Sequence, residues 1–232
     1  MKESHPEGNE IPPVITIDGP SGSGKGTIAG LLAKHLGWHL LDSGALYRIV
    51  AARALDLDIA LDDAAALAAM AGSLSIRFAE DLVEVDGQDL TLVIRTEAVS
   101  AAASEVAALP EVRDAILQAQ RAMCQPPGLV ADGRDMGTVV FPGARLKIYL
   151  DASAEVRAER RYNQLKNKGL SVSLRALLTS LQERDARDKG RAVSPLEPAK
   201  DALVIDSTDL SIDEVLARIH TEVLKRDLVD GV

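Results

Sequence analysis

A glycine-rich segment at residues 19–27, GPSGSGKGT, combines residue types that bind phosphate groups. Gly19, Gly24 and Lys25 have the spacing of the phosphate-loop pattern G-x-x-x-x-G-K-[ST]. In such a loop several backbone N–H groups point into one concavity, the following helix adds partial positive charge, and the lysine supplies a mobile cation. The segment therefore predicts a nucleotide-phosphate site made of Gly19, Pro20, Ser21, Gly22, Ser23, Gly24, Lys25, Gly26 and Thr27.

The residue after Lys25 departs from this pattern. The pattern has Ser or Thr there, and its hydroxyl holds Mg²⁺, whereas this chain has Gly26 and the hydroxyl comes one place later, at Thr27. Two arrangements are open: Thr27 reaches phosphate or metal, or Mg²⁺ is held mainly by the nucleotide and water. The second is typical of nucleoside monophosphate kinases, which the segment Gly-Lys-Gly-Thr resembles, so we assign no metal ligand to the protein.

A second charged segment, ADGRDMGT at residues 131–138, follows an apolar run. Asp132, Arg134 and Asp135 place three charges within four residues at the expected C-terminal end of a buried strand. In open α/β sheets ligands bind at that edge. A solvated turn would also explain the charges, but the flanking Gly133 and Gly137 favour a tight backbone beside a ligand.

Two later segments are rich in arginine. Arg157, Arg160 and Arg161 share one predicted helix, and the segment RDARDKGR at 184–191 carries three more arginines. Guanidinium groups can stabilise the negative charge that spreads over a phosphoryl group during transfer. Some of these side chains, Arg161 and Arg187 foremost, also fit a solvated helix face. Helices of this kind that close over a nucleotide would exclude water from it.

The elements that must position these residues follow from apolar patterning and turn signals. We expect an α/β fold with a parallel sheet, because a strand, the glycine-rich turn, a helix and a second strand follow in order. The pieces SIRF, LVEV and LTLVI around Asp86-Gly87 indicate a small antiparallel insertion. Strands are predicted at 14–18, 38–41, 129–132, 146–150 and 202–205. Helices are predicted at 27–36, 45–57, 62–71, 96–106, 111–124, 154–167, 174–188 and 212–228, the last capped by Ser211.

Composition narrows the class of protein. The chain has 232 residues, 47% of them hydrophobic, and a net charge of -9, which argues against a nucleic-acid partner. The single cysteine, the lack of a signal peptide and the lack of a membrane-length apolar run predict a cytoplasmic protein with no membrane partner. The four histidines lack metal-ligand spacing. A GTPase is disfavoured, because NKGL at 167–170 has Leu170 where the guanine-binding pattern needs Asp.

Five segments together resemble the bacterial cytidylate kinases: GPSGSGKGT, LLDSGALYR at 40–48, IRT at 94–96, ADGRDMGTVVFP at 131–142 and RDARDKGRAVSPL at 184–196. The resemblance runs from Val14 to the final helix. It implies a phosphate-loop core with a parallel sheet, a monophosphate-binding insertion containing the antiparallel sheet, and a short helical lid. The expected divisions are a mobile tail at 1–12, core segments at 13–41, 129–153 and 191–232, the insertion at 42–128 and the lid at 154–190.

The resemblance also implies a reaction, in which ATP phosphorylates CMP or dCMP with the help of Mg²⁺. Residue by residue, it assigns the acceptor nucleotide to three groups. The cytosine would be read by Ser104, Arg113 and Asp135. The ribose would be held by Arg184 and Asp188. The monophosphate would be clamped by Arg48, Arg134 and Arg191, with Ser43 nearby.

On the donor side the resemblance implies that Arg157 contacts ATP, and that Lys25 and Arg160 bridge the moving phosphoryl group. The catalytic residues would be Lys25, Arg134, Arg160 and Arg191. No general base is required, because the attacking phosphate oxygen is already anionic, so catalysis would consist of positioning and charge neutralisation.

Two other functions stay open at this point. A regulatory protein could keep the phosphate loop and phosphorylate no small molecule, although it would need a switch segment and a partner surface. A kinase of the same class could act on UMP, AMP or a small acid such as shikimate. We expect a monomer, because the sequence shows no stripe suited to oligomerisation.

Overall fold

Five parallel strands form the central sheet of the computed structural model, which describes residues 12–79, 82–167, 169 and 171–228. Their order is β2-β6-β1-β7-β8, so the predicted α/β class is confirmed. The tail expected at 1–12 lies almost entirely outside the described residues. The strands are β1 (Val14–Asp18), β2 (His39–Asp42), β6 (Leu129–Gly133), β7 (Leu146–Asp151) and β8 (Leu203–Asp206).

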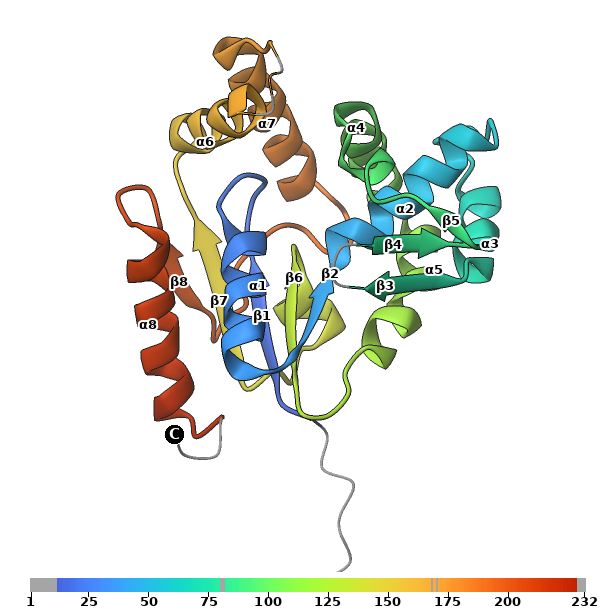
Figure 1. Ribbon diagram of the computed structural model, residues 1–232. Helices are drawn as coiled ribbons and strands as arrows, with labels where there is room; N and C mark the ends of the chain where they lie inside the picture. The colour runs from blue at the N-terminus through green and yellow to red at the C-terminus, as the bar shows by residue number, and fades with distance from the viewer. Residues whose placement is uncertain (1–11, 80–81, 168, 170, 229–232) are drawn as a thin grey trace, which may run out of the picture.

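The middle of the sheet is covered on both faces. Every residue of β1 and β6 is buried, which explains why these strands are almost continuously apolar. Alternate side chains of β6 enter two cores: Val130 joins the core under α1 (Lys25–Leu36) and α8 (Ile212–Lys225), while Leu129 and Ala131 join the other. Figure 1 shows α1 in front of the sheet and α8 beside β8.

The second core extends into a helical region between β2 and β6, at the right of Figure 1. A three-stranded antiparallel sheet lies within it, as predicted. The helices of this region are α2 (Ser43–Asp56), α3 (Ala64–Ser73), α4 (Glu97–Val106) and α5 (Pro110–Ala122), and the strands are β3 (Ile76–Ala79), β4 (Leu82–Val85) and β5 (Gln88–Asp89).

The prediction that LTLVI forms the third strand is wrong. That strand is the two-residue β5, and a 3₁₀ turn, η1 (Val93–Arg95), follows it. Thr91 ends the pairing: its hydroxyl accepts the N–H of Val83 at 2.9 Å, and its own N–H binds the Asp89 carboxylate at 2.9 Å. A side chain thus replaces the backbone partner that a continuing strand would supply.

Two further helices, α6 (Ala154–Asn167) and α7 (Leu174–Lys189), pack against each other above the C-terminal ends of the strands. In Figure 1 they face α4 across the end of the sheet. The α6 helix has the predicted bounds, and the other elements match their predictions to within a few residues. Helix α1, for example, begins at Lys25 instead of Thr27, and α8 ends at Lys225 instead of 228.

Besides η1, a second turn was not predicted. After β6 the chain forms a π-helical turn, η2 (Met136–Val140), where the sequence indicated only a tight backbone. No helix in the part of the chain that the structure describes is long and apolar enough to cross a bilayer.

Candidate active site

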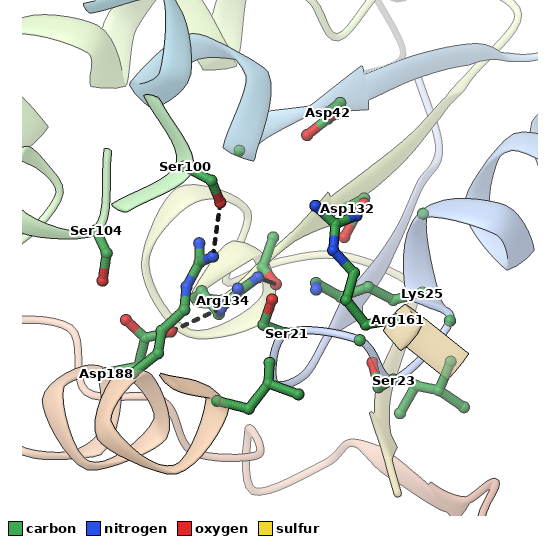
Figure 2. A pocket seen from close by; sticks show the side chains of 18 of the residues that line it. Ser21, Ser23, Lys25, Asp42, Ser100, Ser104, Asp132, Arg134, Arg161 and Asp188 are labelled. Atoms are coloured by element: carbon green, nitrogen blue, oxygen red, sulfur yellow. Dashed lines mark hydrogen bonds and ion pairs between the residues drawn. The ribbon is translucent and has the colours of Figure 1, made fainter. Parts of the chain in front are cut away.

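A cavity of about 1070 Å³ opens at the C-terminal end of the sheet, between the phosphate loop, α4 and the α6–α7 pair. Figure 2 shows side chains from all three regions pointing into it. Most of the residues predicted from the sequence line this one cavity, whereas Gly19, Pro20 and Arg157 lie outside its wall. Those that line it are Ser21, Gly22, Ser23, Gly24, Lys25, Gly26, Thr27, Ser43, Arg48, Ser104, Arg113, Arg134, Asp135, Arg160, Arg184, Asp188 and Arg191.

The phosphate loop has the backbone that its glycines permit. Gly24 ends the loop with a φ of 94° and caps α1, so the first N–H groups of that helix face the cavity. The ammonium of Lys25 donates to the carbonyl of Pro20 at 3.1 Å across the loop. Burial, and after it the charge of Arg134, lower the pKa of Lys25 to about 7, although the charges of Asp132 and Asp42 raise it.

Asp132 lies close to Gly26 of the phosphate loop. A Cβ on residue 26 would stand 3.1 Å from Oδ2 of Asp132, so a serine or threonine there would crowd the carboxylate. Burial raises the pKa of Asp132 to about 6, although the charge of Lys25 lowers it. Asp132 was predicted as one of three local charges but not as a site residue, although its place at a strand end was the signal.

The same residue is the structure's best candidate for a contact with Mg²⁺. Oδ1 of Asp132 is buried and has no hydrogen-bond partner among the described residues, and Thr27 lines the same cavity. Mg²⁺ takes oxygen ligands and usually keeps several waters beside one or two carboxylates. These residues therefore fit the ion. The described residues hold no cluster of three or more His, Cys, Asp or Glu side chains suited to a metal.

A buried polar group lies at the α4–α5 side of the cavity. The guanidinium of Arg113 pairs with the carboxylate of Asp135, with side-chain exposures of 8% and 3%. Arg113 also donates to the carbonyl of Ala107 at 3.2 Å and stands 5.8 Å above the ring of Tyr47. Burial raises the pKa of Tyr47 to about 12, so the phenol stays neutral. The hydroxyl of Ser104 is buried without a partner among the described residues.

Asp188 organises the arginines beside this group. Its carboxylate is 1% exposed and accepts from Nε of Arg134 at 3.0 Å and from Arg191 at 2.5 Å. Arg184 donates to the hydroxyl of Ser100 on α4 at 3.1 Å. Burial, and then the charge of Arg134, lower the pKa of Arg184 to about 10. Several cations are thus held together around one carboxylate, which favours an anionic ligand.

The start of α2 supplies two more site residues. Arg48 pairs with Asp42 at 2.8 Å, and the same aspartate caps α2 by accepting the N–H of Ala45 at 2.9 Å. Ser43 accepts from the amide of Gln120 on α5 at 2.9 Å, which leaves the O–H of Ser43 free to donate. Asp42 and Gln120 were not predicted as site residues. The contact of Gln120 with Ser43 joins residues 77 positions apart, whereas Asp42 bonds to residues three and six positions away and its place before α2 was the signal.

The three arginines of α6 make different contacts. Arg157 donates to the carbonyl of Ser21 at 2.9 Å and pairs with Asp185 at 2.5 Å, so it supports the phosphate loop from outside the cavity. Arg160 donates to the carbonyl of Ser23 at 3.2 Å while it lines the cavity. Arg161 pairs with Glu97 and thereby joins α6 to α4.

Comparison with known proteins gives one family. The family model for cytidylate kinase matches residues 15–225. The cytidylate kinase of Aeromonas hydrophila is 58% identical over 214 residues, which cover 90% of this chain and 93% of that protein. The cytidylate kinase of Pseudomonas putida strain W619 is 58% identical over 227 residues, which cover 95% and 100%. A solved gluconokinase from Sinorhizobium meliloti is 18% identical, covers 93% of this chain and 98% of that chain, and gives a TM-score of 0.44.

Proposed function

The chain belongs to the cytidylate kinase family, and on this premise we propose that it transfers the γ-phosphoryl group of ATP to CMP and dCMP, giving CDP and dCDP. The observation that carries the proposal is the buried group of Ser104, Arg113 and Asp135, which lines the same cavity as the phosphate loop. One end of the cavity suits a nucleotide base, and the other suits a polyphosphate.

The base-binding group has the hydrogen-bond pattern of cytosine. The amino group of cytosine can donate to Asp135, while its ring carbonyl can accept from Arg113 or Ser104. Uracil has a carbonyl in place of the amino group, so its oxygen would face the carboxylate of Asp135 without a proton between them. A site built to bind a donor rejects an analogue without it, because the buried acceptor is then left unpaired.

The cations around Asp188 suit the rest of the acceptor. We assign the monophosphate to Arg48, Arg134 and Arg191, with the free O–H of Ser43 beside them. We assign ribose binding to Arg184 and Asp188. An incoming phosphate would share Arg134 and Arg191 with Asp188, which already aligns both guanidinium groups. The clamp is therefore largely assembled before the ligand arrives, and this reduces the cost of binding.

On the donor side, the loop N–H groups and Lys25 bind the phosphates of ATP, and Arg160 would contact the moving phosphoryl group. Mg²⁺, when bound with the nucleotide, neutralises charge on the β- and γ-phosphates. Asp132 and Thr27 would hold it, in part through water and the nucleotide. The anionic phosphate oxygen of CMP attacks the γ-phosphorus, the bond to the β-phosphate oxygen breaks, and ADP leaves. Closure of α6 and α7 keeps water from taking the place of CMP.

Formation of ADP by the purified protein tests this proposal. The assay contains ATP and Mg²⁺ with CMP, dCMP, UMP, AMP, shikimate or no acceptor. We expect turnover mainly with CMP and dCMP and little in the blank. Turnover with another acceptor would keep the phosphate loop but refute the roles of Ser104, Arg113 and Asp135. Binding of ATP without turnover would favour a regulatory protein. We also propose a monomer, for which light scattering should give the mass of one chain.

A further inference from the structure

Asp18 is a buried carboxylate that takes no part in the proposed reaction. It ends β1, directly before the phosphate loop. We propose that Asp18 is a positioning residue for the acceptor site, because it holds the π-helical turn η2 and so sets the direction of Arg134 and Asp135. This inference rests on the proposed function and adds to it a residue from the donor side of the sheet.

The carboxylate binds the turn with both oxygens. Oδ1 accepts the N–H of Met136 at 2.8 Å, and Oδ2 accepts the N–H of Gly137 at 2.8 Å. These are the first two N–H groups of η2, which have no partner within the turn itself. A bidentate contact fixes both the position and the orientation of the backbone that follows Asp135.

The arrangement frees Asp135 for the base. Asp135 occupies the N-cap position of η2, where an aspartate commonly accepts a backbone N–H of its own turn. Its side chain makes no such bond here and pairs with Arg113 instead. Asp18 on β1 therefore caps the turn in place of Asp135. The carboxylate of Asp135 is then available to bind the base of the substrate.

Close packing holds the turn against β1. A Cβ on Gly137 would lie 2.9 Å from Oγ1 of Thr16 and 3.3 Å from Oδ2 of Asp18. Since there is no room for a side chain, the backbone of η2 lies directly on the strand. A change in the Asp18 contact is then transmitted to Arg134 and Asp135, which are one to three residues away along the chain.

The carboxylate is expensive to keep ionised at this place, which argues against a purely stabilising role. Burial raises the pKa of Asp18 from 3.8 to about 7 although the two N–H groups lower it, and the charges of Asp135 and Asp132 raise it further. The folded chain then binds this proton more tightly than the unfolded chain, so the contribution of Asp18 to stability falls as the pH rises from about 4 to about 7. What the ionised group supplies is the bidentate bond to the turn.

The Asp18→Asn variant tests the proposal. Its amide keeps the shape but offers one acceptor, so one N–H of the turn loses its bond. At about pH 8, where Asp18 is mostly ionised, we expect the KM for CMP to rise about tenfold, the effect of one lost hydrogen bond to a charged acceptor, while the KM for ATP changes less than about twofold. The matched control is Asp151→Asn: Asp151 ends the neighbouring strand β7 and accepts the N–H of Ala152 at 2.9 Å, next to it in sequence.

Amide hydrogen exchange gives a second readout that does not need activity. The N–H groups of Met136 and Gly137 should exchange slowly in the unaltered protein, faster in Asp18→Asn, and unchanged in Asp151→Asn. Equal rises in the KM for CMP and ATP, or an unchanged KM for CMP, would overturn the proposal. Fast exchange at both amides of the unaltered protein would also overturn it, even if Asp18→Asn does not fold. If the unaltered protein does not phosphorylate CMP, the proposed function fails, whereas the exchange rates still decide whether Asp18 holds the turn.

Discussion

Removing the carboxylate of Asp135 tests the acceptor site most directly. In the Asp135→Ala variant the group that would accept from the cytosine amino group is gone, and Arg113 loses its buried partner. We expect kcat/KM for CMP to fall strongly. The KM for ATP should change little, because the Asp135 carboxylate bonds to Arg113 and not to the phosphate loop.

The magnitude follows from the burial of the pair. Loss of a hydrogen bond between a buried charged group and the substrate costs about 1.5–3 kcal/mol, which is about 10- to 150-fold in kcat/KM. Breaking a buried ion pair by removing one partner costs about 3–5 kcal/mol of stability. We expect the lower end, about 3 kcal/mol, because Arg113 keeps the carbonyl of Ala107 at 3.2 Å and lines an open cavity.

The assay varies CMP at saturating ATP and then ATP at saturating CMP. Asp135→Asn replaces the carboxylate by a group that can both donate and accept, so the preference for CMP over UMP should shrink. A double-mutant cycle with Arg113→Met should be clearly non-additive, because the two side chains contact each other. The matched control is Asp114→Ala, which removes an exposed carboxylate from the residue next to Arg113 on α5.

Two results would refute this reasoning. If the KM values for ATP and CMP rise equally in Asp135→Ala, the residue does not contact the base. If Asp114→Ala has the same effect as Asp135→Ala, the loss reflects a general change in α5 and not the pair with Arg113. Urea unfolding of each variant separates the loss of stability from the loss of activity.

Three further predictions concern the donor side and the lid. Binding of ATP at pH 8 should take up protons, because burial lowers the pKa of Lys25 and the triphosphate raises it; calorimetry in buffers of different ionisation heat should detect this uptake, and Lys25→Met should abolish it. Glu97→Gln should change the free energy of unfolding by less than about 1 kcal/mol, since its partner Arg161 pairs with it near the surface. The same variant should raise ATP hydrolysis without acceptor at low salt, because the pair of Arg161 and Glu97 joins α6 to α4 across the cavity. A hydrolysis rate equal to that of the unaltered protein would contradict a role of this pair in closing α6 over the cavity. Gly19→Ala should lower the free energy of unfolding by about 3 kcal/mol or more, because its φ is 153° and a Cβ would overlap the carbonyl oxygen of Leu150; a loss under about 1 kcal/mol in urea would contradict this.

Local patterning was enough for most of the fold. The apolar runs of β1 and β6 predicted buried parallel strands, and Asp86-Gly87 predicted the hairpin between β4 and β5. The failure at LTLVI has a physical reason, since Thr91 uses its hydroxyl and its N–H to close the sheet. Apolar spacing cannot distinguish a strand from such a turn, because Leu90 and Ile94 are buried in either case.

The candidate site was predicted less evenly. Residues at strand ends and in the glycine-rich loop could be named from the sequence, and most of them line one cavity. Asp42, Gln120 and Asp185 were missed because each acts through a partner on a different element. Arg157 was correctly placed on a helix, but its helix spacing could not show that the side chain supports the loop from outside the cavity.

By itself the sequence determined the α/β class, the phosphate loop and the family, because these depend on residue types at short, regular spacings. Only the tertiary structure determined the role of each buried carboxylate in and beside the site. Asp18, Asp132 and Asp135 follow similar apolar runs, yet one caps a turn, one faces Lys25 and one pairs with Arg113. The role of a buried charge depends on the partners that reach it. Here those partners lie on η2, α1 and α5, which only folding brings together.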